Sequence, residues 1–598
     1  MAARVLAVRI QGAFVEVPVS DLVPLHPEST GKALVQRRPT VASRRVAVLA
    51  TALLTALAFL IALQIRAWSG AVNADGISYM ELGAQYARGD LSALANGYWS
   101  PLYPLLLGIA FLVAKRPAID ASGAVFTPEL RAVLATNVAI VVLATLLYAR
   151  LLFELDLSDA SGELDDLRMT RFAAAGSLWI WWIVRFSLVT TTTPDLLLAA
   201  CLAATSTELV IAGTRPSRWG AARMGIALAV GFWTKAVFFL VMPVAIVAYL
   251  LLVGRARARQ HATPLILTAA ILSAPLVLVQ SASQGHFSFG ETGRLNYGWY
   301  VNDVSHGAPV VESRAASRAR HDRPGVIQLD VAPGVVLYSG EPAASFPYWY
   351  DPSRFEPAAS PKLSATNQWR TLEHNARWFR VVGGAFGALC LLALAISARR
   401  RRLAAIHLLV ALPALTLVAL HALTHPEGRL VGSAIVCSLA VILFWRGRQR
   451  ATSVRRAVVL YEAGALACIP LLIALRLGSS AALRPLRVSV GPGSALARMG
   501  VAPRSRIGLI GSPYGQYWAH QLGLRISVVD APTGAPPVVD RELLTRIAEE
   551  SCDRGAPLVA ILWRVTPESR SVGATELPGG WLVWRPLSHC RLADARSA

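Results

Sequence analysis

The sequence is poor in charged residues, which make up 16% of its 598 positions, while hydrophobic residues make up 54%. The mean hydropathy is +0.48, which is higher than a soluble domain of this length needs. This composition predicts a membrane protein that crosses the bilayer many times. Acidic residues are also scarce, with 36 Asp and Glu against 58 Lys and Arg. Because the arginines fall in short clusters between apolar runs, they indicate membrane topology and not nucleic-acid binding.

Cysteine is scarce as well, with six in the chain. Four of these lie in apolar runs and no pair has a metal-type spacing, so the sequence offers no cysteine-based metal site. Only Cys552 and Cys590 are placed to meet as a disulfide. Residues 1–45 lack the short apolar core and small-residue cleavage site of a signal peptide, and we expect them to form a cytoplasmic extension. The sequence shows neither an internal repeat nor a low-complexity linker.

Apolar runs of membrane length divide residues 46–479 into about 11 expected crossings, at about 1.5 Å of helix per residue. The first covers 46–65, and Arg44 and Arg45 hold its start in the cytoplasm. The run 102–114 is too short to span and is expected at the outer interface. Residues 219–253 are expected to form a hairpin of two short helices that turns near 233–235. The other expected spans are 132–153, 172–189, 199–211 with the turn before it, 264–281, 381–398, 404–423, 430–445 and 457–475.

These assignments place every arginine-rich connection in the cytoplasm and the C-terminus outside. We therefore expect reporters fused after Arg259 and after Arg402 to report the cytoplasm. Those fused after Ser313 and at the C-terminus should report the outside. Paired phosphatase and fluorescent-protein fusions measure this, and finding the Ser313 and Arg259 fusions on the same side would contradict the topology.

Two large parts are expected outside the membrane besides the loop after the first span, 67–130. Residues 284–378 form a long loop rich in aromatics, with GETGRLNYGWYVND and FPYWYDPSRF, which is typical of a binding lid. In residues 480–598, RIGLIG and PLVAILW are expected strands and RELLTRIAEE an expected helix. The turn GLIGSPYG lacks dinucleotide-binding spacing and indicates a plain strand-to-helix turn. The expected architecture is an α-helical multi-pass membrane protein with a C-terminal soluble α/β domain.

The unusual polar residues converge on the outer side. Asp75 lies in the polar stretch 73–104, NADGISYMELGAQYARGDLSALANGYWSPLYP, directly after the first span. A carboxylate at a membrane mouth costs desolvation unless it is used, so Asp75 is a candidate functional residue. Six further residues lie on the same side: Arg185, Asp195 in TTTPDLLLA, Lys235 at the hairpin turn, and His425, Glu427 and Arg429 in HPEGRL.

Each of these residues also has a structural interpretation. The stretch around Asp75 can be a solvated loop with ordinary helix caps. Asp195 can belong to the first turn of a helix that starts at Thr193 and Pro194, where the helix dipole favours a carboxylate. Lys235 and Arg185 can be cations that reach to the interface, and HPEGRL can be a solvated turn. The joint placement of all of them on one face favours function.

These stretches, in this order, resemble the GT-C glycosyltransferases, membrane enzymes that take sugar from a polyprenyl-phosphate carrier. The family includes aminoarabinose, protein-mannosyl and rhizobial lipopolysaccharide transferases. The likeness covers roughly residues 46–445 and rests on NADGISYMELGAQYARGD with NGYWSPLYPLLLG, on TTTPDLLLA, on GFWTKAVFF and on HPEGRL. Two departures stand out. The family often has a second acid where Gly76 stands here, and HPEGRL lacks the aromatic that often follows its arginine.

The resemblance implies transfer of a sugar from a polyprenyl-phosphate donor to an extracytoplasmic glycan, lipid or protein acceptor by inverting displacement. The acceptor hydroxyl must lose a proton as it attacks, so a carboxylate base is needed, and Asp75 is the best placed. Cations must neutralise the leaving phosphate, which suits Lys235, Arg429 and Arg185. If a divalent cation such as Mg²⁺ or Mn²⁺ is used, Asp195 would hold it with Asp75. The candidate substrate-binding residues are Tyr79, Trp99, Tyr103, His425 and Glu427.

Two other functions are compatible with the sequence. A flippase or transporter for lipid-linked sugars should carry ionisable groups near the middle of the membrane and broken helices in matching halves. Here the candidates gather on one side and no repeat is visible. A non-catalytic envelope assembly factor is favoured only by the missing second acid. For all three functions the expected location is the bacterial plasma membrane.

Overall fold

The structure is a computed structural model of the whole chain. It describes residues 5–10, 13–18, 41–68, 70, 72–114, 128–158, 165–304, 326–328, 335–338, 344–354, 361–379, 401–444, 492–511, 516–530, 538–553, 557–564, 573–577 and 580–586.

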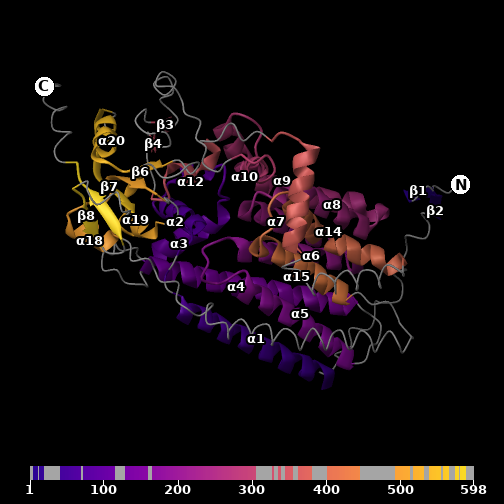
Figure 1. Cartoon of the computed structure of the whole chain (residues 1–598). Coiled ribbons are helices and arrows are strands. Elements are labelled where there is room, and N and C mark those ends of the chain that lie inside the picture. Colours follow the sequence, from indigo (N-terminus) through magenta and orange to yellow (C-terminus); the bar gives the residue numbers. More distant parts are fainter. Residues whose placement is uncertain are drawn as a thin grey trace.

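Long helices form the largest part of the described structure (Figure 1). Their bounds are α1 Val41–Ala67, α4 Pro128–Ser158, α5 Asp165–Arg185, α6 Asp195–Thr214, α7 Arg218–Thr234, α8 Phe238–Val253, α9 Arg255–Gln284, α14 Arg401–Leu423 and α15 Gly428–Phe444. Five described segments are long and apolar enough to cross a membrane: Ala47–Ala67, Pro128–Ser158, Asp195–Thr214, Arg255–Gln284 and Ile406–Leu423.

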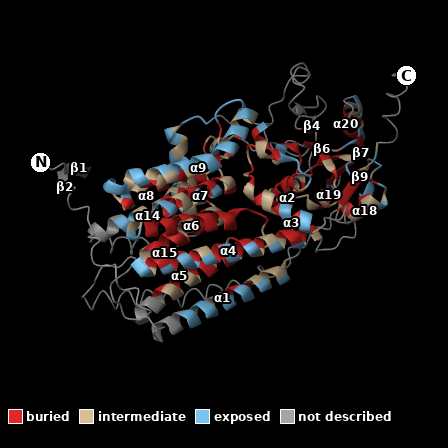
Figure 2. Cartoon of the chain, turned by 180° about the vertical axis from the view of Figure 1, so that it is seen from behind, coloured by how far each residue is buried: buried red, intermediate tan, exposed pale blue. Residues whose placement is uncertain are grey.

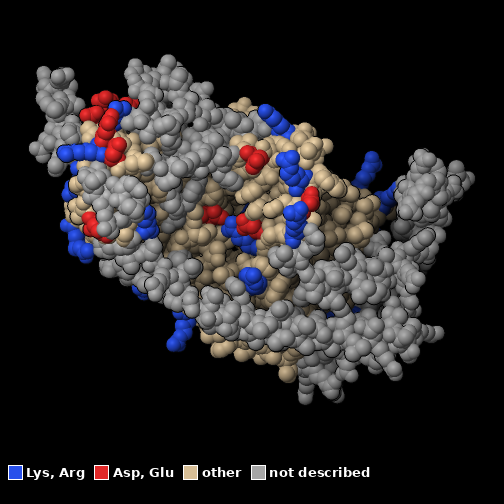
Figure 3. Space-filling model, viewed as in Figure 1, with Lys and Arg blue, Asp and Glu red and all other residues tan. Residues whose placement is uncertain are grey.

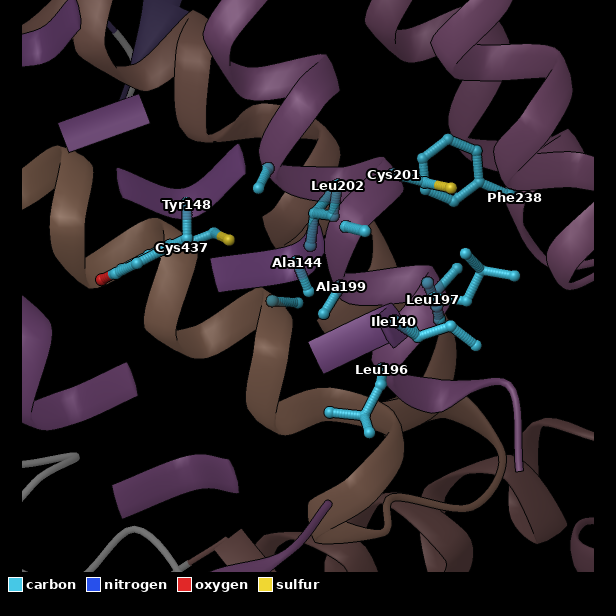
Figure 4. Packing of buried hydrophobic residues seen from close by; sticks show 14 of the residues in the cluster. Ile140, Ala144, Tyr148, Leu196, Leu197, Ala199, Cys201, Leu202, Phe238 and Cys437 are labelled. Atoms are coloured by element: carbon cyan, nitrogen blue, oxygen red, sulfur yellow. The ribbon is translucent and has the colours of Figure 1, made fainter. Parts of the chain in front are cut away.

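Helix α6 is the centre of this bundle, and Figure 2 shows it buried along its length while α1 is mostly exposed. Its side chains, such as Leu202, pack against side chains of α4, α8 and α15, among them Tyr148, Phe238 and Cys437 (Figure 4). The opposite face of α4 exposes apolar residues such as Leu146, which is 60% exposed. A soluble protein would not leave such faces open to water, so the bundle indicates a membrane protein.

Each expected span within the described part overlaps a helix, but the ends differ, and α9 begins at Arg255, nine residues before the expected start at 264. The short run expected at the interface is α3, Leu102–Val113. The expected hairpin is α7 and α8, which are joined at Lys235 to Val237. The expected spans 381–398 and 457–475 lie outside the described residues, so the count of 11 crossings stays a prediction.

The polar stretch after the first span, expected as a loop, is largely helical. It contains α2 (Ala74–Ala87) and the 3₁₀ helix η2 (Leu91–Ala95), and α3 follows. Apolar residues of α2, including Ile77 and Met80, are fully buried. A Cβ on Gly108 would lie 2.9 Å from the carbonyl oxygen of Gly83, so these two glycines let α2 and α3 pack closely. Tertiary packing therefore makes this stretch a helix.

A seven-stranded sheet stands at one end of the bundle (Figure 1). Its order is β3-β4-β6-β5-β7-β9-β8, and the central strands β6, β5 and β7 run parallel. The short helices α18 (Gly493–Arg498) and α19 (Tyr517–Gln521) and the longer α20 (Arg541–Asp553) belong to the same part. The strands are β3 Val326–Gln328, β4 Val335–Tyr338, β5 Arg506–Ile510, β6 Arg525–Asp530, β7 Leu558–Arg564, β8 Thr575–Leu577 and β9 Trp581–Trp584.

The sheet joins two regions that are far apart in the sequence. Strands β3 and β4 come from the long loop expected as a lid, and β4 pairs antiparallel with β6. The sheet therefore takes in residues that precede the expected domain boundary at 480. A separate hairpin, β1 (Val5–Ile10) with β2 (Ala13–Pro18), lies near the N-terminus at the far end of the molecule (Figure 1).

The sheet lies on the same side of the bundle as α2. Helix α19 packs against α2, so the C-terminal part and the loop that follows the first span share one side of the membrane. Which side this is stays a prediction from the arginine clusters. Cys552, near the end of α20, is disulfide-bonded, and its predicted partner Cys590 lies outside the described residues.

Candidate active site

Charged side chains from four helix ends, one of them the start of α2, meet in one place. Asp75 lies in the first turn of α2, Asp195 begins α6, Lys235 follows the last residue of α7, and Arg429 lies in the first turn of α15. In the space-filling view, acidic and basic atoms lie together in a hollow near the middle of the face shown (Figure 3). All four residues were candidates from the sequence, and folding brings them together at helix ends.

Arg429 is the centre of the cluster because its guanidinium contacts three carboxylates. Its Nη2 lies 2.9 Å from Oδ2 of Asp75, and its Nε lies 2.6 Å from Oε2 of Glu427. Its Nη1 lies 3.9 Å from Oδ2 of Asp195. The arginine side chain is still 28% exposed, so a bound anion can reach it. A planar guanidinium with several donors suits contacts with carboxylate and phosphate alike.

Lys235 forms the second ion pair of the site. Its Nζ lies 2.6 Å from Oδ1 of Asp195, and the lysine side chain is 20% exposed while that of Asp195 is 2% exposed. A carboxylate this deeply buried needs charged partners to offset desolvation. Asp195 therefore lies in a helix first turn and also holds two cations in place.

The turn before α15 supports Arg429 from the other side. His425 Nε2 lies 3.2 Å from Oε1 of Glu427, and the His425 ring stacks on Tyr300 with centroids 4.1 Å apart. Burial raises the pKa of Glu427, but the hydrogen bond with His425 and the charge of Arg429 outweigh it and lower this pKa to about 2. Glu427 is therefore ionised at physiological pH, and its contribution to stability is lost only as the pH falls through about 2.

Close packing around position 76 explains why a glycine stands there in this structure. A Cβ at this position would lie 2.8 Å from Cβ of Thr192 and 2.7 Å from Oδ1 of Asn73. These neighbours leave no room for a side chain unless α2 moves away from the loop before α6. The second acid that the GT-C family often carries at this place does not fit here without such a movement.

Aromatic rings from three segments form a wall next to the charged cluster. The ring centroids of Tyr79 and Trp99 are 5.0 Å apart, and those of Trp99 and Trp349 are 5.5 Å apart, both in edge-on contacts. The Tyr98 centroid lies 5.6 Å from that of Trp299 and 6.0 Å from that of Trp349. Of these rings, only Tyr79 and Trp99 were named as candidates from the sequence. Aromatic rings with a few polar groups are typical linings of small-molecule sites.

Two phenols of this wall lie near the candidate base. Burial and then the negative charge of Asp75 raise the pKa of Tyr79, and the same two causes in the same order raise the pKa of Tyr98. Both phenols are therefore neutral at physiological pH. Each keeps a proton that it can donate to a ligand oxygen.

Tyr103 has a supporting position. Its ring is fully buried and its hydroxyl donates to Oδ1 of Asn137 at 2.7 Å. The Asn137 amide in turn donates to the carbonyl oxygens of Val189 and Thr191. Tyr103 thus fixes the backbone of the loop that leads to Asp195, and its hydroxyl is already engaged in that role.

Arg185 ends α5 and is exposed. Its guanidinium lies 4.9 Å above the ring of Phe186. Phe186 packs directly on Gly428, at the start of α15. Arg185 is therefore near the HPEGRL turn, at the edge of the cluster that Arg429 centres.

The residues present do not fit a divalent cation between Asp75 and Asp195. The guanidinium of Arg429 already contacts both carboxylates, and Lys235 holds the other oxygen of Asp195. Among the described residues, no group of three or more His, Cys, Asp or Glu side chains is arranged to hold a metal. In this arrangement, cationic side chains take the place between the acids.

Sequence reasoning missed several residues of the site. Tyr300, which stacks on His425, lies more than 190 positions after Tyr98 in the chain, and so do Trp299 and Trp349, whose rings both contact Tyr98. Their only sequence signal was the aromatic content of the stretches 290–303 and 346–355. No pattern in the sequence indicated which ring would turn toward Asp75.

Comparisons with known proteins give a distant likeness. No family model matches the chain, and no curated protein matches its sequence. The crystal structure of ArnT from Cupriavidus metallidurans bound to undecaprenyl phosphate is similar to it, with 11% identity, a TM-score of 0.49, and coverage of 90% of this chain and 99% of that chain. The apo structure of the same protein is similar with 11% identity, a TM-score of 0.45, and coverage of 91% and 98%. A likeness this distant does not say what the chain binds or does.

Proposed function

We propose that this chain is a membrane glycosyltransferase that moves a sugar from a polyprenyl-phosphate donor to an extracytoplasmic acceptor. The observation that carries the proposal is that Asp75 pairs with Arg429 while Asp195 links Arg429 to Lys235, so that a carboxylate and two cations gather beside the aromatic wall. One cluster thus offers a base, a phosphate site and a surface for a sugar. This is the set of groups that transfer from a phosphate leaving group requires.

The proposed reaction is a single displacement. The acceptor oxygen forms a bond to the anomeric carbon and gives its proton to the Asp75 carboxylate. The bond from that carbon to the phosphate oxygen breaks, and the electron pair stays on the phosphate. Arg429 and Lys235 neutralise the charge that develops there. Attack opposite the leaving group inverts the anomeric centre. A phosphate is a weak base, so no paired catalytic acid is needed as in glycoside hydrolysis.

Donor binding is proposed to have a second effect, which is to separate the ion pair of Asp75 and Arg429. Asp75 is 2.9 Å from Arg429, so its carboxylate is engaged with the guanidinium in this arrangement. When a donor phosphate takes up donors of Arg429, it competes with Asp75 for the same guanidinium. We expect the carboxylate to be released toward the acceptor hydroxyl, so that the base becomes active when donor is present.

The aromatic wall is the proposed place for sugar and acceptor. Tyr98 and Tyr79 carry neutral phenols close to Asp75, and these phenols can donate hydrogen bonds to sugar hydroxyls. Trp349 is partly exposed and offers an apolar face on which a sugar ring can lie, and the buried rings of Trp99 and Trp299 support the wall behind it. His425 and Glu427 are proposed to act mainly by holding Arg429.

The test is transfer by the purified full chain in lipid. Polyprenyl-phosphate sugars of several kinds are offered with membrane glycolipid acceptors, and mass analysis follows products. The expected result is release of polyprenyl phosphate and a product of inverted anomeric configuration. Loss of one glycan from a strain lacking the protein would identify sugar and acceptor. Movement of the intact lipid-linked sugar across vesicles, with no bond cleaved, would instead support the flippase.

A further prediction concerns metal dependence and Asp195. We propose that Asp195 orients Lys235 and Arg429 and does not hold a divalent cation. Wild-type turnover should therefore persist after treatment with a chelator. Asp195→Asn should reduce stability by about 1–3 kcal/mol, since the buried pair with Lys235 loses its charge, and should raise the donor KM. The measurements are steady-state kinetics and thermal unfolding.

The matched control is Asp90→Asn. Asp90 lies on an exposed turn of the same outer region, and its carboxylate accepts hydrogen bonds from the backbone N and the hydroxyl of Ser92 within that turn. This variant should keep both stability and rate within about 0.5 kcal/mol. Activity that disappears with chelator and returns with Mg²⁺ or Mn²⁺ would show that a metal is required after all.

A further inference from the structure

A buried histidine joins the C-terminal sheet to the helix that carries Asp75. His520 lies in α19, and its side chain is 4% exposed. Its Nε2 is 3.0 Å from Oε1 of Glu129, in the first turn of α4. Its Nδ1 is 3.6 Å from Oε1 of Glu81, in the middle of α2. One imidazole thus bridges two carboxylates from two other elements.

The surroundings favour the doubly protonated, positively charged form of this imidazole. Burial lowers the pKa of His520, but the charges and hydrogen bonds of Glu129 and Glu81 outweigh it and raise this pKa to about 9. The Tyr517 ring stacks on the imidazole from its own helix, with centroids 5.8 Å apart. Tyr350 lies near Glu81, and burial first and then Glu81 raise the pKa of its phenol, so it stays neutral.

Both carboxylates have further support, so the cluster is a built contact. Ser345 donates to Glu81 from its backbone N at 3.2 Å and from its hydroxyl at 2.6 Å. Glu129 lies in the first turn of α4, where the helix dipole favours a negative charge. Ser345 itself follows β4 of the long loop. Four segments of the chain therefore meet at His520.

The contact bears on Asp75 through α2. Asp75 and Glu81 are six positions apart on the same helix, which is about 9 Å at 1.5 Å per residue. Arg429 holds the first turn of α2 at Asp75, and His520 with Ser345 holds its middle at Glu81. Gly76 packs α2 closely on Thr192 between these points. A movement of Glu81 would thus be passed to Asp75 as a tilt or shift of one rigid helix.

We propose that His520 is a positioning residue, whose imidazolium fixes α2 against α4 and the C-terminal sheet so that Asp75 meets the acceptor in the correct place. The proposal rests on the proposed function for its effect on transfer. Its structural part, the fixing of α2 by His520, is independent of any activity. It gives the C-terminal part a role in the reaction without a group of its own at the reacting atoms.

The test compares His520→Gln with the wild type in the full chain in lipid. Hydrogen exchange of the α2 amides should become at least about tenfold faster in the variant, because the buried charge contact is lost. The kcat should fall about tenfold to a hundredfold, the effect of a misplacement of about 1 Å, with the donor KM nearly unchanged. His374→Gln is the matched control, since His374 is exposed on the helix 365–379, and it should change neither quantity.

The pH dependence is a second readout. A folded-state pKa of His520 raised to about 9 means that its stabilising contact is complete below the ordinary histidine pKa of about 6.5 and is lost as the pH rises through about 9. In the wild type, α2 exchange corrected for its intrinsic pH dependence should therefore accelerate near pH 9, while that of α20 should not. In His520→Gln this step should be absent.

The outcomes separate the two proposals. Unchanged α2 exchange in His520→Gln, or a wild type with no step near pH 9, would overturn the positioning role. If the variant does not fold, the wild-type pH series decides alone. If exchange behaves as expected but no lipid-linked sugar is turned over by the wild type, the positioning of α2 stands and the proposed function fails.

Discussion

Asp75→Asn is expected to reduce turnover by roughly two to four orders of magnitude, the range that general-base catalysis usually supplies. The amide keeps the shape of the carboxylate and can still accept a hydrogen bond from Arg429, but it cannot take the acceptor proton. Donor binding should be kept and become slightly tighter, because the phosphate contacts come from Arg429 and Lys235 and the amide competes less than the carboxylate for Arg429. The expected signature is a lower kcat with no rise in the donor KM.

The control for this variant is again Asp90→Asn, which makes the same chemical change in the same stretch, residues 73–104. It should keep the wild-type rate, and both variants should keep the wild-type unfolding temperature within a few degrees. If purified Asp75→Asn protein transferred sugar at the wild-type rate, Asp75 would not be the base. The flippase function would then be the one to pursue.

Arg429→Ala is expected to weaken donor binding about tenfold to a hundredfold, since a charge-assisted contact of about 1.5–3 kcal/mol is lost. Turnover should fall further, by about 10²–10³, because the contact strengthens as charge develops on the leaving phosphate. Lys235→Ala should act in the same direction. Binding of a non-reactive donor analogue and single-turnover rates separate the two effects.

Removing Arg429 also leaves Asp75, Asp195 and Glu427 without the guanidinium that they share. Part of any loss in Arg429→Ala could therefore come from folding, and thermal unfolding must accompany the kinetics. Arg429→Lys keeps the charge but not the planar set of donors, so it should fold and retain part of the donor affinity. Arg377→Ala is the matched control, because Arg377 is 65% exposed and pairs with Glu373, one turn before it on the surface. Wild-type donor affinity in both Arg429 variants would remove the phosphate role.

Local properties of the chain were enough to predict the membrane class, the approximate positions of the long apolar helices and the charged residues of the candidate site. Hydrophobic length and arginine position act locally, so the hairpin of α7 and α8 and the short α3 could be located without a structure. Asp75, Asp195, Lys235 and Arg429 could be singled out for a similar reason, since a charge next to an apolar run is conspicuous wherever the chain later folds.

Which of these groups touch depends on the three-dimensional packing. Arg429 and Asp75 are 354 positions apart and 2.9 Å apart in space, and no local pattern encodes that contact. The helix α2 also depends on packing, because it is buried against the neighbouring α3 and against Thr192, which lies more than 100 positions later in the chain. The bridge of His520 to Glu81 and Glu129 was invisible in the sequence, where a histidine in a soluble-looking segment carries no signal. Such contacts depend on long-range packing, in which the free energy of burying a charge is offset only by a partner that another part of the chain supplies.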